Sequence, residues 1–170
     1  MNVVVVVGNP KPASRTRRAA EMVAERLTGS APAATLELAE LGARLLGFGD
    51  PEVETAKRTV RDAELVVWAS PTYKATYTGL LKCFMDQFSA GELGGKDAVA
   101  LMLGGSPVHA MAGELTLKPV LTEIGCSCPA PALFLLESEW ESSPGFDAWL
   151  ARAAVAHRLP QAGRHSREGL

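Results

Sequence analysis

Short apolar segments alternate along the chain with longer segments in which apolar residues recur at helical spacing. The first apolar segment is a run of five valines, Val3–Val7, followed by Gly8. A β-branched run without polar alternation is typical of a strand buried on both faces of a parallel sheet. Four further strands are predicted, at Ala34–Leu38, Glu64–Ser70, Lys96–Met102 and Ala132–Leu136.

Helical periodicity is found between these strands. Ser14 is a good N-cap for the first helix and Gly29 a plausible stop, while Asp50 and Pro51 are typical of the start of the second. Pro119 falls inside or near a break in the fourth. The predicted helices cover Ser14–Leu27, Asp50–Ala63, Thr78–Ser89, Ala110–Ile124 and Gly145–Arg158.

The alternation of strands and helices predicts an α/β fold with a doubly wound parallel sheet and helices on both faces. Five strands with an anion-binding loop after the first suit the flavodoxin-like order 2-1-3-4-5. In such sheets ligands bind beyond the carboxyl ends of the strands, so the loops after strands one, three and four carry the candidate site. We expect a single domain over residues 1–158 and a flexible tail over 159–170.

Composition indicates a globular chain and excludes several classes of function. Of 170 residues, 47% are hydrophobic, and Lys+Arg 17 against Asp+Glu 19 gives a formal net charge of −2. Nucleic-acid binding needs clustered excess cations, which are missing here, so no nucleic-acid partner is expected. No apolar run approaches the ~20 residues that span a membrane, and Met1-Asn2 leads directly into the valines. A cytoplasmic protein without a membrane partner is the expectation.

Cysteines and histidines predict no metal site. The three cysteines, Cys83, Cys126 and Cys128, form no regular disulfide framework, and the C-x-C pair is too close for the usual metal or redox spacing. A structural role is favoured for them. His157 and His165 have no neighbours that suggest metal binding.

The loop after the first strand predicts an anion site. Hydrogen-bond donors are dense in it, and the following helix would present free backbone N–H groups at its start. It matches neither the nucleotide triphosphate motif nor the dinucleotide motif, so a monophosphate fits better. An ordinary Ser-capped helix is the alternative interpretation. The candidate ligands are Asn9, Lys11, Ser14, Arg15 and Thr16.

The loop after the third strand is rich in hydroxyl groups and holds both tyrosines, Tyr73 and Tyr77. Aromatic rings could stack on a planar ligand, and hydroxyls could bind phosphate or ring edges. In the alternative interpretation, Thr78 caps the next helix and the tyrosines are half-buried anchors. Pro71 is expected to turn the chain out of the sheet.

The loop after the fourth strand contains Gly104, Gly105 and His109. Two glycines allow backbone N–H groups to approach a ligand closely, which would suit the electron-rich edge of a flavin. His109 is a weak candidate for a catalytic residue, since a lone histidine is more often a capping or packing residue. Together the three loops offer what flavin mononucleotide (FMN) requires: a phosphate anchor, contacts for ribityl and ring, and donors at the pyrimidine end.

Three motifs resemble those of the NADPH-dependent FMN reductases of flavodoxin-like fold, nearest to the flavin reductases of alkanesulfonate monooxygenase systems. Gly8–Thr16 is similar to the family's G-S-P-R-x-x-S-R-[ST] phosphate loop. Ser70–Lys82 resembles its P-x-Y-x-x-[SA]-[YF]-[ST]-G-x-L-K stretch. Gly104-Gly105 with His109, followed by Leu117–Leu121, looks like its G-G-x-x-x-H and L-K-P-x-L pair.

The resemblance implies hydride transfer from NAD(P)H to N5 of FMN, homodimers or homotetramers, and a monooxygenase partner that takes the reduced flavin. Helices after strands three and four would form the subunit contacts, with Phe84, Met85, Phe88 and the Met111 region partly in the interface. Ser14, Arg15 and Thr16 would hold the phosphate. The ribityl and ring contacts would be Pro71, Thr72, Tyr73, Lys74 and Thr76, and the pyrimidine contacts Gly104, Gly105 and His109.

One position departs from the family pattern. The branch that releases reduced FMN carries an inserted tyrosine that widens the helix before L-K-P-x-L, where this chain has Leu115 or Thr116. Members without it can hold FMN as a prosthetic group and reduce a quinone or similar small acceptor. A non-enzymatic flavodoxin-like electron carrier is a further alternative. The sequence does not choose between NADH and NADPH.

Overall fold

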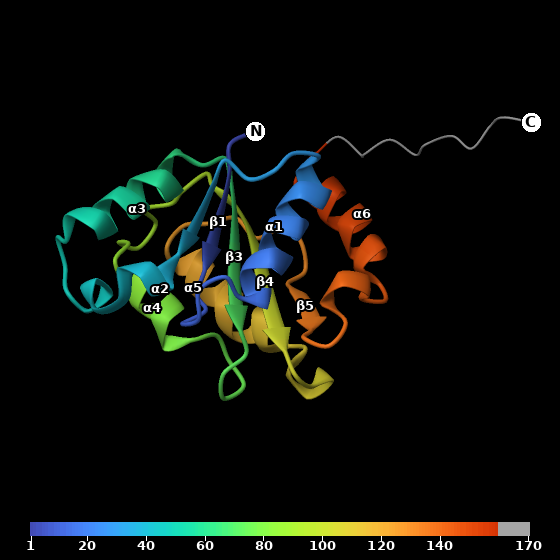
Figure 1. Ribbon diagram of the computed structural model, residues 1–170. Coiled ribbons are helices and arrows are strands. Elements are labelled where there is room, and N and C mark those ends of the chain that lie inside the picture. Colours follow the sequence, from blue (N-terminus) through green and yellow to red (C-terminus); the bar gives the residue numbers. More distant parts are fainter. Residues whose placement is uncertain (160–170) are drawn as a thin grey trace, which may run out of the picture.

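The computed structural model describes residues 1–159. Five parallel strands form one sheet in the order β2-β1-β3-β4-β5, which confirms the predicted topology (Figure 1). All strands point the same way, so their carboxyl ends share one edge of the sheet. The strands are β1 (Val3–Val7), β2 (Ala34–Glu37), β3 (Leu65–Pro71), β4 (Asp97–Gly104) and β5 (Leu133–Leu136).

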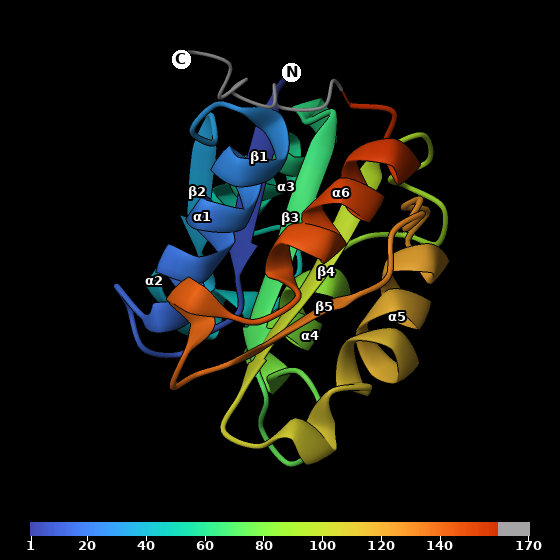
Figure 2. The ribbon, with the colours of Figure 1, turned by 90° about the vertical axis from the view of Figure 1, so that its right-hand side faces the viewer.

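Helices cover both faces of this sheet. In Figures 1 and 2, α1 and α6 lie together on one face, and α5 lies on the other. The first and last helices within residues 1–159 therefore pack side by side on the face that they share. The helices are α1 (Arg15–Thr28), α2 (Leu38–Leu41), α3 (Pro51–Asp62), α4 (Gly79–Met85), α5 (Lys118–Glu123) and α6 (Phe146–Ala156).

The valine run shows why the sheet needs two cores. Val3, Val5 and Val7 pack with α1 and α6, while Val4 and Val6 join the core beneath α3, α4 and α5. All five are at most 2% exposed. Since side chains alternate across a strand, an unbroken apolar run is stable only where both faces are covered.

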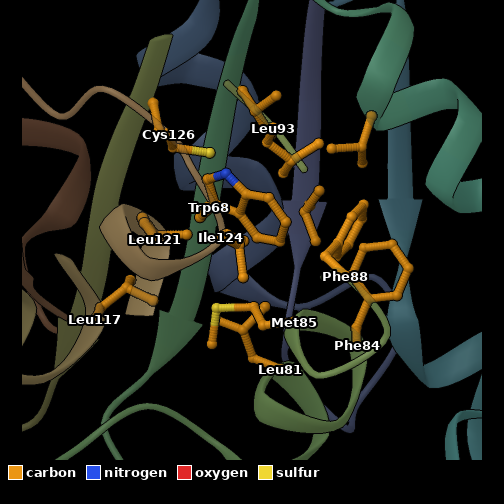
Figure 3. Packing of buried hydrophobic residues seen from close by; sticks show 14 of the residues in the cluster. Trp68, Leu81, Phe84, Met85, Phe88, Leu93, Leu117, Leu121, Ile124 and Cys126 are labelled. Atoms are coloured by element: carbon orange, nitrogen blue, oxygen red, sulfur yellow. The ribbon is translucent and has the colours of Figure 1, made fainter. Parts of the chain in front are cut away.

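Trp68 lies at the centre of the second of these cores (Figure 3). Its ring centroid is 6.2 Å from those of Phe84 and Phe88, which meet each other edge to face at 5.3 Å. Phe84, Met85 and Phe88 are all buried within the chain itself. The chain's own core therefore covers most of these three side chains, while Met85 and Phe88 also line a surface pocket; their part in a subunit contact stays a prediction.

The carboxyl ends of three strands differ from the predicted ends. β3 continues through Pro71, which pairs with Leu103, so the proline does not turn the chain out of the sheet. β4 extends to Gly104, which pairs with Leu136 on β5. Leu38 belongs to the short helix α2 and not to β2. In each case, pairing or packing with a neighbouring element decides where the strand ends.

The later helices are shorter than the periodicity predicts. α4 ends at Met85, not at Ser89. The segment predicted as one helix over Ala110–Ile124 contains a π-helical turn, Gly113–Leu117, followed by α5. Pro119 is the second residue of α5 and closely follows the π-helical turn, so the regular α-helical hydrogen-bonding pattern changes beside the proline, where a break was predicted.

No helix of the described residues is long and apolar enough to cross a membrane. Within residues 1–159 there is also no group of three or more His, Cys, Asp and Glu side chains that could hold a metal ion. The predicted tail lies outside the described residues, apart from Leu159. The end of the predicted domain, at residue 158, coincides with the last turn after α6.

Candidate functional site

A cleft of about 450 Å³ opens at the carboxyl edge of the sheet. Its walls come from the loop after β1, the start of α1, the end of β3 and the segment after β5. Seven predicted ligands line it together with three residues that the sequence did not single out: Asn9, Lys11, Ala13, Ser14, Arg15, Thr16, Arg18, Pro71, Tyr73 and Glu137.

Two buried hydroxyls at the start of α1 face this cleft. Ser14 is the N-cap, and its Oγ accepts a hydrogen bond from the backbone N–H of Arg17 at 3.3 Å. Thr16 Oγ1 accepts one from Asn9 Nδ2 at 3.0 Å. Because each oxygen already accepts from a protein donor, its hydroxyl proton is left to donate to an anion. The Ser-capped helix of the alternative interpretation is confirmed, and because the cap adjoins the cleft it is compatible with an anion site, which stays a prediction.

The loop after β1 is held in place by a carboxylate, Glu37, that the sequence analysis did not single out. Glu37, buried at the end of β2, accepts a hydrogen bond from the backbone N–H of Ala13 at 2.9 Å and pairs with Arg17. Ala13 has a positive φ of 50°, and Asn9 Oδ1 accepts from the N–H of Lys11 at 2.9 Å. A strained, non-glycine conformation is held in place by these bonds, so the loop is preformed.

Arg15 is already paired inside the cleft. Its Nη2 lies 3.2 Å from Oε2 of Glu137, and its Nη1 donates to the backbone carbonyl of the same residue at 3.2 Å. Figure 2 shows the segment after β5 running beside the loop that precedes α1. Glu137 directly follows the predicted strand Ala132–Leu136, so a search that included the loop after strand five would have found it.

Arg18, a cation that the sequence analysis did not single out, also lines the cleft. Its guanidinium carbon lies 5.5 Å from the centre of the Trp140 ring, a cation–π distance. Arg18 extends the donor-rich wall by one turn of α1. The sequence signal was present in the Arg17-Arg18 pair, but only the fold decides that Arg18 faces the cleft and Arg17 faces Glu37.

The loop after β3 is a tight hairpin turn. Tyr73 and Thr76 exchange two backbone hydrogen bonds, of 2.8 and 3.2 Å, around Lys74 and Ala75. Both central residues have positive φ, 51° and 67°, although neither is glycine. This geometry projects Tyr73, which is 50% exposed, toward the cleft. Lys74 and Thr76 do not line the cleft itself.

Tyr77, the other tyrosine of this loop, is instead an anchor. It packs against the core beneath α4, and burial raises the pKa of its hydroxyl. The alternative interpretation of the sequence is thus right for Tyr77 and also for Thr78, whose hydroxyl caps α4 by accepting from the N–H of Leu81.

Thr72 lies between Pro71 and Tyr73, two residues of the cleft wall, but does not itself line the cleft; its backbone N–H donates to the carbonyl of Leu103 on β4. Its Oγ1 is a buried oxygen with no hydrogen-bond partner among the described residues. A hydroxyl in this state is costly unless a ligand or water satisfies it. A ligand that extends from the cleft along the carboxyl edge would pass near this hydroxyl, which would have to turn outward to meet it.

Gly104 lies beside Thr72, and close packing gives glycine at this position a reason that the sequence analysis did not foresee. A Cβ at Gly104 would lie 2.7 Å from Cζ of Phe134 and 3.2 Å from Thr72 Oγ1. The glycine is thus required by the close packing of β4 against β5 and the β3 loop. At Gly105, which is exposed, a Cβ would meet nothing within 4 Å.

His109 ends a short 3-10 turn after Gly105 and does not line the cleft. Its backbone N–H donates to the carbonyl of Ser106. Apolar side chains, not titratable ones, dominate the surface near this turn: Val108, Met111 and Leu115 are 78%, 56% and 69% exposed. The role of His109 toward a ligand stays a prediction.

The π-helical turn at Gly113–Leu117 corrects one expectation. The widened helix is present although the inserted tyrosine is not, so the backbone of this turn does not depend on that side chain. Thr116 Oγ1 donates to the carbonyl of Ala112 at 2.6 Å and accepts from Thr76 Oγ1 at 2.8 Å. The wide turn and the β3 hairpin are therefore joined by a hydrogen bond.

The cysteines are not reactive groups of this site. Burial raises the pKa of the Cys126 thiol to about 12 and that of Cys128 to about 11. Both thiols stay protonated near neutral pH, which makes them poor nucleophiles and poor metal ligands. All three cysteines are free, as the structural interpretation expects.

Together, the fold and the cleft define a flavodoxin-like α/β protein with a donor-lined cleft at the start of α1 and an unsatisfied hydroxyl near it. The sequence profile of the NADPH-dependent FMN reductases matches residues 1–141. The chain belongs to this family.

Relatives and solved structures agree with that assignment. The chain is 30% identical over 128 residues to FMN reductase (NADPH) of Escherichia coli, covering 73% of this chain and 67% of the relative. It is 30% identical over 128 residues to the NADH-dependent FMN reductase SfnF of Pseudomonas putida, covering 71% and 69%. The apo NADH:FMN oxidoreductase EmoB superposes with a TM-score of 0.80 at 26% identity, covering 95% and 91% of the two chains.

Proposed function

We propose that this protein transfers hydride from NAD(P)H to FMN and that the reduced flavin supplies a monooxygenase. The observation that carries the proposal is the donor-lined cleft at the start of α1, beside the unpartnered hydroxyl of Thr72. Bound FMN supplies the redox chemistry through its ring. The protein's part is to hold and orient the flavin, since no side chain is needed as a nucleophile.

In this proposal the phosphate lies against α1. Ser14 and Thr16 donate their free hydroxyl protons, Lys11 and Arg15 supply charge, and the amides at the helix start add their partial positive charge. The 14-residue helix is long enough for its dipole to favour an anion there. Asn9 acts by keeping Thr16 in position.

The ribityl chain and ring would extend along the carboxyl edge past Pro71 and Tyr73. Thr72 Oγ1 would donate to a flavin oxygen, which satisfies an otherwise unpaired group. Lys74, Thr76, Gly104, Gly105 and His109 are proposed for the outer part of the site, at the ring. They do not line the cleft at α1, which is consistent with a ligand much longer than its phosphate.

We test the phosphate contacts with Ser14→Ala combined with Arg15→Ala. FMN affinity is measured by flavin fluorescence, and each lost hydrogen bond to a charged group should cost about 1.5–3 kcal/mol. Arg58→Ala, an exposed change on α3, is the matched control. Unchanged FMN affinity in the double variant would contradict the assignment of Ser14 and Arg15 to the phosphate.

Release of reduced FMN is supported by the wide turn at Gly113–Leu117, which forms in this chain. The second candidate function, a flavoprotein that retains FMN and reduces quinones or similar acceptors, is favoured by the missing tyrosine at Leu115 and Thr116. Flavin content after purification separates the two. A colourless protein that turns over NAD(P)H only with added FMN supports release, and a yellow one supports retention.

The same steady-state assay tests the remaining alternatives. Running it with NADH and with NADPH determines the preferred nicotinamide, which differs between the relatives' names. No turnover with either nucleotide would move the assignment to an electron carrier. We also propose a homodimer or homotetramer in the cytoplasm; the exposed apolar residues Val108, Met111 and Leu115 support a subunit contact near the site.

A further inference from the structure

The cleft at α1 contains one carboxylate among its cations. Lys11, Arg15 and Arg18 line it together with Glu137. A site that only had to bind a phosphate would gain affinity from leaving this acid out, since like charges repel. The presence of the Glu137 carboxylate in this cleft therefore needs a separate explanation.

The position of Glu137 is set by the sheet. Its backbone N–H donates to the carbonyl of Gly104 at 3.0 Å, directly after Leu136 pairs with Gly104. The main chain at Glu137 is thus fixed at the carboxyl edge, and only its side chain can move away. Arg15, from the other wall of the cleft, reaches both the carbonyl and the carboxylate.

The ion pair lies within reach of solvent. The Arg15 side chain is 54% exposed and that of Glu137 is 35% exposed. Pairs of this kind contribute little stability, about 1 kcal/mol or less. An incoming phosphate can therefore take over Arg15 at a small cost, while the displaced carboxylate stays close enough to repel it.

We propose that Glu137 determines the flavin affinity of this site, as an internal anion that competes with the phosphate of FMN for Arg15. This inference rests on the proposed function. Its consequence is that FMN binds weakly enough to exchange, and that the preference for FMN over riboflavin, which has no phosphate, is reduced.

The test is Glu137→Gln, which keeps the size of the side chain and an acceptor oxygen while it removes the charge. In low salt, the FMN dissociation constant measured by flavin fluorescence should fall about fivefold, and the gain should shrink as salt is added. Riboflavin affinity should not change. Glu139→Gln, an exposed change two residues away, controls for net charge.

A double-variant experiment locates the effect on Arg15. In an Arg15→Ala background, Glu137→Gln should improve FMN binding by a smaller factor than in the wild type, because the contested partner is gone and only direct repulsion of the phosphate is relieved. Glu137→Ala should act in the same direction as Glu137→Gln, which keeps the test valid if one variant folds poorly by circular dichroism.

FMN affinity that is unchanged or weaker in both Glu137 variants overturns the inference; weaker affinity would mean that Glu137 positions Arg15 for the phosphate. An equal gain with riboflavin would overturn it too. These outcomes differ from failure of the proposed function, in which the wild type binds no FMN or Arg15→Ala leaves its affinity unchanged.

Discussion

The two halves of the carboxyl edge are built on different principles. On the α1 side, the loop is closed by internal hydrogen bonds, with Glu37 and Asn9 fixing the backbone around buried hydroxyls. On the β3 and β4 side, exposed loops carry apolar side chains and a hairpin with two left-handed residues. In the proposed function, the α1 side is a preformed anchor for the FMN phosphate. The β3 and β4 side would stay open so that the flavin and nicotinamide rings can enter.

The largest difference in unfolding free energy is expected between alanine substitutions at two glycines, Gly8 and Gly105. Gly8→Ala places a Cβ 2.5 Å from Cβ of Leu81, so we expect a loss of about 1–3 kcal/mol in unfolding free energy from overpacking. Gly105→Ala, on the open side, meets nothing within 4 Å and should leave stability nearly unchanged. Urea denaturation of both variants measures this. Equal losses would show that the anchor is no more tightly packed than the ring side.

The second effect is expected at Glu37, the carboxylate that holds the backbone of the loop before α1. Glu37→Ala removes the acceptor for Ala13 N–H and the partner of Arg17, and should lower unfolding free energy by about 2 kcal/mol. FMN affinity should fall with it, because the loop loses its preformed shape. Glu40→Ala, exposed on α2, is the control for removing an acid nearby. A stable variant with normal FMN affinity would contradict the role given to Glu37.

Substitutions in the hairpin turn at Lys74 and Ala75 should instead raise the unfolding free energy. Lys74→Asn with Ala75→Gly introduces residues that tolerate the observed positive φ values, and we expect a gain of about 1 kcal/mol in unfolding free energy. A single Ala75→Gly should give part of this gain. Thermal denaturation monitored by circular dichroism checks it. A loss of stability would indicate that the turn is not strained in solution.

The smallest effect is expected where the two open loops meet. Thr76→Val removes the hydrogen bond from Thr76 Oγ1 to Thr116 Oγ1 and should cost about 0.5–1.5 kcal/mol. Hydrogen exchange at Gly113–Leu117 should rise, because the hairpin no longer holds the wide turn. Thr59→Val, a half-buried position on α3 whose hydroxyl donates only within its own helix, is the matched control. Unchanged exchange would show that the two loops move independently.

Much of the fold could be predicted because its signals are local. The valine run requires a strand covered on both sides, and Ser14, Asp50 and Thr78 each cap a helix with their own side chain. Strand order was inferred from the position of the anion loop. The seven predicted residues that line the cleft follow from the same local chemistry.

Tertiary structure alone decided the contacts that tune the site. Arg15 meets Glu137 across 122 positions, Ala13 meets Glu37 across 24, and Gly104 is required by a ring on the neighbouring strand. Such contacts depend on which strands become neighbours, and no local pattern encodes that. The sequence by itself predicted an anion site at the start of α1; only the packed sheet brought the Glu137 carboxylate next to Arg15 in that cleft.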